Sequence, residues 1–183
     1  QGSVVQTSLF ETALGWVWRH VADYGATGKI QPGVGTGHNS LTPYQAFEAA
    51  DGPVVIAAGN DRLFAKMAGV LGHSEWVNDP RFATNAERTR NRDTLLPMIV
   101  ELVRLRPAQQ WTDLLEAAGV PCAPINSVPQ VVAHEQTHAI GMLLDSQNEQ
   151  LKIMGLPLSI DGQRPGFGAK APALGEHQQS LSE

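Results

Sequence analysis

The strongest constraint on the fold is a change in apolar spacing near residue 60. Residues 47–59 place two short apolar runs on either side of Asp51-Gly52, and this arrangement predicts a β-hairpin with a buried second strand. From there on the apolar residues recur at helical spacing, in a segment that Asn60 is suited to cap and Gly72 to end. A hairpin followed directly by a helix predicts a core that mixes both element types.

Further helices and strands are predicted on both sides of this segment. Ser8 and Glu11 have the spacing of a capping box, which predicts a helix that begins at Leu9. Apolar spacing predicts helices over 9–24, 92–105, 108–118 and 129–139, strand-like segments over 4–5, 141–145 and 151–160, and a proline-broken strand or loop over 120–128. Because strands and helices alternate, the predicted fold class is α/β or α+β.

Composition excludes several classes of protein. The chain has 183 residues, 42% apolar and 17% charged, which is enough apolar material for a packed core and unlike a disordered chain. A formal net charge of −5 without a lysine or arginine cluster argues against nucleic acid as a partner. No apolar stretch reaches the roughly 18 residues of a spanning helix, and no leader pattern is visible. We therefore expect no membrane partner and a cytoplasmic location.

Cys122 is the single cysteine of the chain. It has no partner for an internal disulfide and no second cysteine with which to form a metal-binding pair. It lies in an apolar, proline-flanked segment. We therefore expect a buried apolar residue and not a reactive thiol.

The sharpest match to a catalytic pattern is HEQTH at residues 134–138. On a helix, His134 and His138 would lie on one face and hold Zn²⁺, with Glu135 as the general base. A catalytic zinc needs a third protein ligand, and Leu144 stands where the longer form of the motif has its third histidine. We expect no metal site, and a zinc metallopeptidase is kept only as an alternative.

Glycines are densest at Gly33, Gly35 and Gly37, directly before His38. Such a run can expose backbone N–H groups to a phosphate, but a dinucleotide fingerprint lies between a strand and a helix. Here a helix precedes the glycines and a hairpin follows, which favours a loop without that role. Residue spacing alone identifies no complete catalytic group.

Short sequence words in a fixed order resemble one protein family along nearly the whole chain. They lie at residues 38–47, 50–52, 57–64, 79–92, 111–126, 141–142, 155–158 and 171–177. Together they resemble the family III CoA-transferases, the CaiB/BaiF group that includes formyl-CoA transferase and carnitine CoA-transferase. The HEQTH pattern falls where this family has an ordinary helix, which weakens the zinc interpretation.

The resemblance implies an enzyme that moves CoA from an acyl-CoA to a carboxylic acid through a covalently acylated aspartate. Coenzyme A would be a substrate, and no cofactor would be covalently bound. The resemblance implies the family's domain plan. That plan has a large Rossmann-like domain with the nucleophilic aspartate, a connector, a small α+β domain and a C-terminal return segment. On that plan residues 1–34 are the last strand and connector helix of the large domain, 35–145 the small domain, and 146–183 the return segment. The nucleophile would lie outside this chain, so none of its acids is assigned as catalytic and the chain alone is expected to be inactive.

The resemblance also indicates where substrate would bind. Residues 35–42 correspond to a glycine-rich loop that covers the active site in some family members, although here the loop has fewer glycines and bulkier side chains. We expect the substrate-binding residues to be Gly35, Gly37, His38, Asn39 and Ser40, with the last three near the acyl portion of the substrate.

Expected partners are an acyl-CoA, a carboxylic acid, the N-terminal half of the same enzyme and a second subunit in an interlocked homodimer. Such partners imply apolar surface on this chain, at Leu9, Trp16, Val17, Trp18 and residues 153–160. Besides the zinc metallopeptidase, two further alternatives to the transferase stay open. One is a racemase of α-methylacyl-CoA with the same fold, and the other is a non-catalytic acyl-CoA-binding or assembly module.

Overall fold

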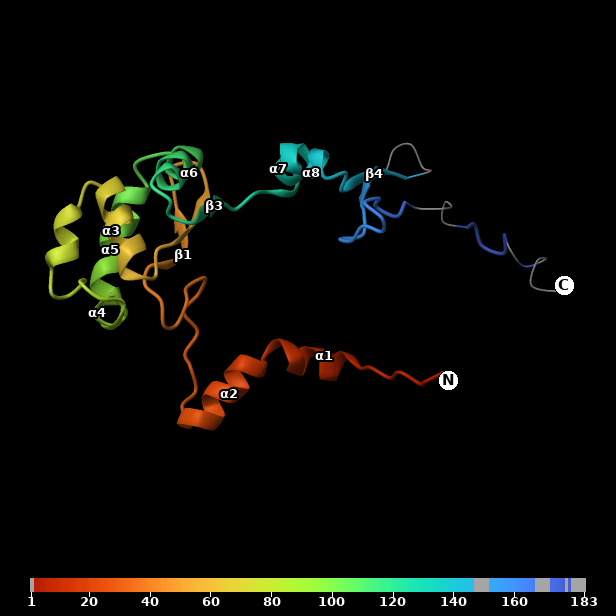
Figure 1. Ribbon diagram of the computed structural model, residues 1–183, viewed down its shortest axis with the longest axis horizontal. Coiled ribbons are helices and arrows are strands. Elements are labelled where there is room, and N and C mark those ends of the chain that lie inside the picture. The colour runs from red at the N-terminus through yellow and green to blue at the C-terminus, as the bar shows by residue number, and fades with distance from the viewer. Residues whose placement is uncertain (1, 147–151, 167–171, 177, 179–183) are drawn as a thin grey trace. The chain divides into compact units, whose positions relative to one another are not determined.

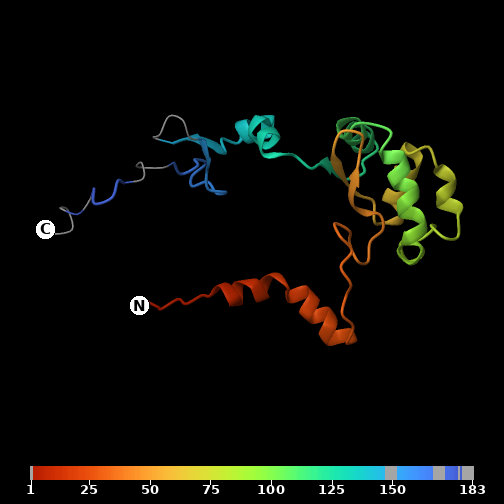
Figure 2. The same cartoon turned by 180° about the vertical axis from the view of Figure 1, so that it is seen from behind.

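A computed structural model describes residues 2–146, 152–166, 172–176 and 178. The chain divides into two compact units, Gln1–Ile125 and Asn126–Glu183. Figure 1 shows the first unit in red to green and the second in cyan to blue, and Figure 2 shows both from behind. The three-part division at residues 34 and 145 stays a prediction.

The first unit is built on a three-stranded antiparallel sheet in the order β1-β2-β3. Strands β1 (Tyr44–Glu48) and β2 (Pro53–Ala57) form the predicted hairpin, with Phe47 opposite Val54. Strand β3 (Cys122–Pro124) pairs with β2 from the other side. Alternate residues of β2 are fully buried, as one face of a covered sheet requires.

Helices cover the apolar face of this sheet. They are α3 (Asp61–Val70), α4 (Asn85–Arg90), α5 (Arg92–Val103) and α6 (Ala108–Ala117), with the 3₁₀ helix η1 at Ser74–Asn78. The shared core includes Ile56, Phe64, Leu95, Ile99 and Leu115, each at 1% exposure or less. As predicted, Asn60 caps α3, since its Oδ1 accepts the Leu63 N–H at 2.9 Å.

Helix α4 was not predicted. Its residues are mainly polar and carry no apolar period. Thr84 stabilises its start by accepting the Glu87 N–H at its hydroxyl, 3.3 Å away. A short capped helix of this kind leaves little trace in hydrophobic spacing.

The N-terminal part of the first unit differs from the prediction in two ways. The expected helix over 9–24 is two helices, α1 (Leu9–Trp16) and α2 (Trp18–Thr27), because Val17 leaves helical geometry at φ −99° and ψ 10°. The expected strand at Val4 and Val5 is wrong. Neither lies in a strand, and their side chains are 88% and 86% exposed, since within the described residues no neighbouring strand supplies ladder hydrogen bonds.

The second unit contains α7 (Val128–Ala133), α8 (Glu135–Ala139) and a two-stranded antiparallel sheet of β4 (Leu143–Asp145) and β5 (Lys152–Met154). The predicted helix over 129–139 is therefore interrupted at His134, which has extended backbone angles. Both predicted strands are confirmed in shorter form. Leu151, the first residue of the second predicted strand, lies outside the described residues, as do residue 171 and His177 of the last family-like word.

The fold class is mixed α/β with small antiparallel sheets, which is the α+β form of the prediction. Among the described residues, no helix is long and apolar enough to cross a membrane. A cytoplasmic location stays a prediction.

Apolar surface is exposed where it was expected. Leu9, Trp16 and Trp18 are 91%, 81% and 68% exposed, and Val17 is also exposed. In the second unit, Met154, Leu156, Leu158 and Ile160 are about half exposed or more. Large apolar side chains in such numbers are typical of a surface that another part of a protein covers.

One buried arginine joins the parts of the first unit. The Arg88 side chain has no exposed surface and donates to the carbonyl oxygens of Thr42 (2.8 Å), Phe82 (3.0 Å) and Gly59 (3.1 Å). It also donates to Asp61 Oδ1 at 2.9 Å, and its guanidinium carbon lies 4.3 Å from the centre of the Phe64 ring. Burial lowers the pKa of Arg88, and the hydrogen bond and charge of Asp61 oppose that shift.

We expect Arg88→Met to destabilise the fold strongly. The variant leaves three backbone carbonyls without their donor, each at a cost of about 1–3 kcal/mol, so the free energy of unfolding should fall by about 3 kcal/mol or more. Urea denaturation measures the change. Arg104→Met removes only an exposed ion pair with Glu101 and serves as the control, expected within about 0.5 kcal/mol of the unmutated chain. Equal stability of the two variants would contradict this account.

Candidate functional site

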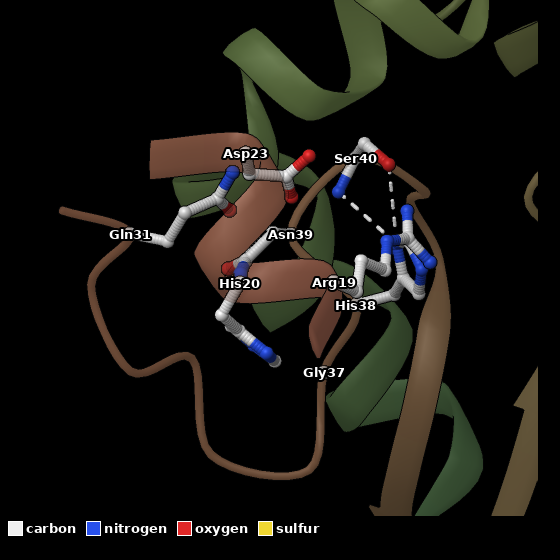
Figure 3. Close-up of a pocket in the computed structure, with 8 residues that line it drawn as sticks. All are labelled: Arg19, His20, Asp23, Gln31, Gly37, His38, Asn39 and Ser40. Atoms are coloured by element: carbon white, nitrogen blue, oxygen red, sulfur yellow. Dashed lines mark hydrogen bonds between the residues drawn. The ribbon is translucent and has the colours of Figure 1, made fainter. Parts of the chain in front are cut away.

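A polar cavity of about 400 Å³ lies in the first unit between α2 and the loop that precedes β1. Its lining residues are Arg19, His20, Asp23, Gln31, Gly37, His38, Asn39 and Ser40 (Figure 3). Four of the five predicted substrate-binding residues therefore share one cavity. Gly35 is not among the lining residues.

Gly35, together with Gly37, shapes the turn that leads into the cavity loop. Gly35 has a φ of +62°, a conformation that glycine adopts without strain, and the Gly37 N–H donates to the Val34 carbonyl at 3.0 Å. A Cβ at position 37 would lie 3.0 Å from that same carbonyl oxygen. The Thr36 hydroxyl accepts the Ala46 N–H at 3.1 Å and so ties the turn to β1.

The orientation of His38 is fixed by its neighbours. Its Nδ1 accepts the backbone N–H of Ser40 at 3.1 Å and lies 3.3 Å from the Ser40 hydroxyl, as the dashed lines in Figure 3 show. The ring stacks on Tyr44 with 5.7 Å between centroids and 10° between planes. Because Nδ1 acts as the acceptor, the neutral ring carries its proton on Nε2. His38 therefore has one N–H left to donate.

The charged residues of the cavity come from α2. Arg19 and Asp23 are four residues apart on one helix and contribute a guanidinium and a carboxylate to the same cavity. Within the described part of the chain, Arg19 forms no ion pair. The cavity thus has amide, imidazole and guanidinium donors that suit an anionic or carbonyl oxygen.

Sequence reasoning missed Arg19, His20, Asp23 and Gln31. A polar helix face looks like ordinary solvent-exposed surface, so hydrophobic spacing gives no sign that it lines a cavity. The one signal in the sequence was the position of these residues along the chain. The helix that carries three of them leads directly into the glycine segment, so its polar face could be expected near the cavity loop.

The HEQTH segment does not have the geometry of a zinc motif. His134 lies before α8 with φ −67° and ψ 132°, and its Nδ1 accepts the Gln136 N–H at 3.1 Å. Only His138 lies within the helix, so the two imidazoles do not share a helical face. No group of three or more histidine, cysteine, aspartate or glutamate side chains is placed to hold a metal ion among the residues the structure describes.

Cys122 is half-buried beside the core, with its Sγ 3.7 Å from the Thr112 carbonyl oxygen. Burial raises the pKa of its thiol, and the negative charge of Glu116 adds to the shift. A raised pKa leaves little thiolate near neutral pH, which is the opposite of what a nucleophilic cysteine needs.

Comparison with known proteins identifies the family. The profile of CoA-transferase family III matches residues 1–178, and the chain belongs to this family. The acetyl-CoA:oxalate CoA-transferase of Acetobacter aceti is 33% identical over 186 residues, which cover 99% of this chain and 46% of that protein. The succinyl-CoA:glutarate CoA-transferase of Homo sapiens is 27% identical and is matched over 97% of this chain and 41% of its own length.

A solved structure gives the same result for the fold. A CaiB/BaiF family protein from Brucella suis superposes with a TM-score of 0.81 at 32% identity, over 96% of this chain and 46% of that one. The resemblance stated from sequence words is therefore confirmed. The chain spans about half the length of the curated relatives it matches.

We expect the chain to hold no stoichiometric zinc, because the two imidazoles in HEQTH lack a common helical face and the described residues supply no third ligand beside them. The measurement is metal content by mass spectrometry after incubation with one equivalent of zinc chloride and gel filtration. His134→Ala and His138→Ala should give the same value as the unmutated chain. One zinc per chain that is lost in either variant would contradict the structure.

We expect Cys122 to react slowly with an aromatic disulfide reagent. At pH 8 the folded chain should react about tenfold or more slowly than the chain unfolded in urea, because burial both shields the thiol and raises its pKa. The rate of the folded chain should climb as the pH rises toward that pKa, since only the thiolate reacts. Equal folded and unfolded rates at pH 8 would show an accessible thiol with an ordinary pKa.

Proposed function

We propose that this chain is the small-domain portion of an acyl-CoA:carboxylate CoA-transferase. Membership of CoA-transferase family III supports the reaction, and the observation that carries the site is that Gly37, His38, Asn39 and Ser40 line one cavity. We further propose the division into residues 1–34, 35–145 and 146–183, with the first and last segments belonging to a large domain. The relatives extend well beyond the matched region, which supports a further large domain in the whole enzyme.

The reaction we propose proceeds through an aspartate carried by the other half of the enzyme. Its carboxylate attacks the thioester carbonyl, the bond to sulfur breaks, and the CoA thiolate leaves an acyl-aspartyl anhydride behind. The CoA thiolate then attacks the aspartyl carbonyl of this anhydride, which releases the donor acid and leaves an aspartyl-CoA thioester. The acceptor carboxylate attacks that thioester, which forms a second anhydride and releases the CoA thiolate again. The thiolate finally attacks the acceptor's acyl carbonyl, which gives the new acyl-CoA and restores the aspartate. No acid of this chain takes part as the nucleophile.

The residues of this chain would bind and orient the acyl portion. His38 offers its Nε2–H, Asn39 its side-chain amide, and Ser40 its hydroxyl, and each can donate to a carbonyl or carboxylate oxygen. Gly37 allows the loop backbone to turn where a Cβ would crowd the Val34 carbonyl. Donors held in place in this way stabilise an oxygen on which charge develops and help to exclude water.

We propose a short dicarboxylic acid as the acceptor. The two relatives above are named for oxalate and glutarate, and both of these acids have a second carboxylate. Arg19 contributes a guanidinium without an ion pair in the described part of the chain, in the same cavity as His38. A guanidinium can bind a carboxylate through two parallel hydrogen bonds.

The partners we propose are an acyl-CoA, the large domain of the same enzyme and a second subunit in an interlocked homodimer. Exposed side chains of α1 and α2, among them Trp16 and Trp18, offer apolar surface for such contacts. Burial of these side chains would contribute to stability through the hydrophobic effect.

The test is CoA transfer by the full-length protein that contains this chain, with succinate and butyrate as matched acceptors. We expect transfer to succinate and little to butyrate. His38→Ala should lower kcat/KM for transfer by about tenfold to a hundredfold, the cost of one lost buried hydrogen bond.

His73→Ala is the control, because His73 lies outside the cavity, paired with Glu75 and stacked on Trp76. It should keep the unmutated kcat/KM. Absence of transfer to every acid tested would refute the transferase. Equal losses in the two histidine variants would refute the role of His38.

A further inference from the structure

The loop that lines the cavity is held from behind by side chains of α4 and α5. Arg92, the first residue of α5, donates from Nη2 to the Asn39 carbonyl at 2.8 Å and to the His38 carbonyl at 3.4 Å. The same nitrogen lies 3.4 Å from the Thr42 hydroxyl. One guanidinium nitrogen therefore contacts the loop at three residues, His38, Asn39 and Thr42.

Asn85, the first residue of α4, binds the loop with both ends of its amide. Its Nδ2 donates to the Ser40 carbonyl at 2.8 Å, and its Oδ1 accepts the Thr42 N–H at 3.1 Å. Its own backbone N–H donates to Asp61 at 2.8 Å, and Asp61 is also bonded to the buried Arg88. The bond to Asp61 fixes the backbone of Asn85, from which the side-chain amide reaches the loop.

Packing adds a further anchor. Leu41 lies so close to Gly59 that a Cβ built on Gly59 would be 2.8 Å from the Cβ of Leu41. Thr42 is buried, and its carbonyl accepts from Arg88 Nε at 2.8 Å. From His38 to Thr42, the backbone carbonyls of His38, Asn39, Ser40 and Thr42 all accept a hydrogen bond from α4 or α5.

A loop with so many anchors cannot move freely. Opening it would break several hydrogen bonds together and leave the donors of Arg92 and Asn85, both only partly exposed, without their acceptors. The backbone carbonyls of the loop accept hydrogen bonds from α4 and α5, while His38, Asn39 and Ser40 line the cavity. This arrangement is that of a preformed wall.

We propose that Asn85 and Arg92 are positioning residues, which hold residues 38–42 as a preformed wall of the substrate cavity. This inference rests on the proposed function, because it takes the cavity as the place where the acyl portion of the substrate binds. Neither residue touches substrate. They act through the loop, by keeping the donors of His38, Asn39 and Ser40 in one arrangement before substrate arrives.

Preorganisation of this kind has a distinct kinetic signature. If the loop occupies the competent arrangement only for a fraction of the time, the apparent dissociation constant rises by the inverse of that fraction. Substrate at saturation restores the competent loop. Loosening the anchors therefore raises KM and leaves kcat nearly unchanged, whereas general destabilisation of the fold reduces the amount of active enzyme.

The first experiment follows amide hydrogen exchange in residues 36–42 of the 183-residue chain. Arg92→Met and Asn85→Ala should each speed exchange of the Ser40 and Thr42 amides by about tenfold or more, because the loop opens more often. Arg104→Met is the matched control, since Arg104 pairs with exposed Glu101 and touches no loop residue. It should leave the exchange rates unchanged.

The second experiment measures CoA transfer by the full-length protein with the same variants. Arg92→Met should raise KM for the acyl-CoA or the acid by about tenfold with kcat kept within about twofold. Arg92→Lys, which keeps the charge and can reach one carbonyl, should fall between Arg92→Met and the unmutated protein. Urea denaturation of each variant separates loosened loops from unfolded protein.

The outcomes distinguish the two proposals. Faster exchange together with the KM effect supports the positioning role. Transfer with unchanged exchange and KM in Arg92→Met and Asn85→Ala overturns the positioning role alone, and so does a fall in kcat at constant KM. No transfer by the unmutated full-length protein overturns the proposed function, and with it the substrate role of the wall.

Discussion

The buried guanidinium of Arg88 is the interaction on which the rest of the first unit depends. It joins the segment before β1 at Thr42, the segment after β2 at Gly59, the turn before α4 at Phe82 and the start of α3 at Asp61. A buried cation is tolerated only where its donors are satisfied, so each of these four segments must reach its place for the network to form. The position of the cavity loop is set by the same condition.

The local elements could be predicted from the sequence where short-range physics determines them. The Asp51-Gly52 turn, the Asn60 cap and Gly72 after α3 each act within a few residues, and each is found as predicted. The failures have a common cause. Val17 and His134 interrupt predicted helices that apolar spacing alone would continue, and α4 has no apolar spacing to detect.

The site was only partly predictable for a related reason. Resemblance to a family marked residues 35–42, but their partners are far away in sequence, and the bond from Arg88 to Thr42 spans 46 residues. Periodicity and capping patterns describe neighbours along the chain and carry no information about such pairs. For the same reason, spacing along the chain could not show that Arg19 and Asp23 of α2 line the cavity.

The central claim is that the loop held by Asn85, Arg88 and Arg92 faces the acyl portion of the substrate. The most direct test is a crystal structure of the full-length protein with an acyl-CoA bound. The account predicts His38 Nε2 or the Ser40 hydroxyl within hydrogen-bond distance of an oxygen of the acyl group, about 2.7–3.2 Å, with the Asn85 and Arg92 contacts unchanged. An acyl group bound away from residues 37–40, or a loop displaced from α4 and α5, would contradict it.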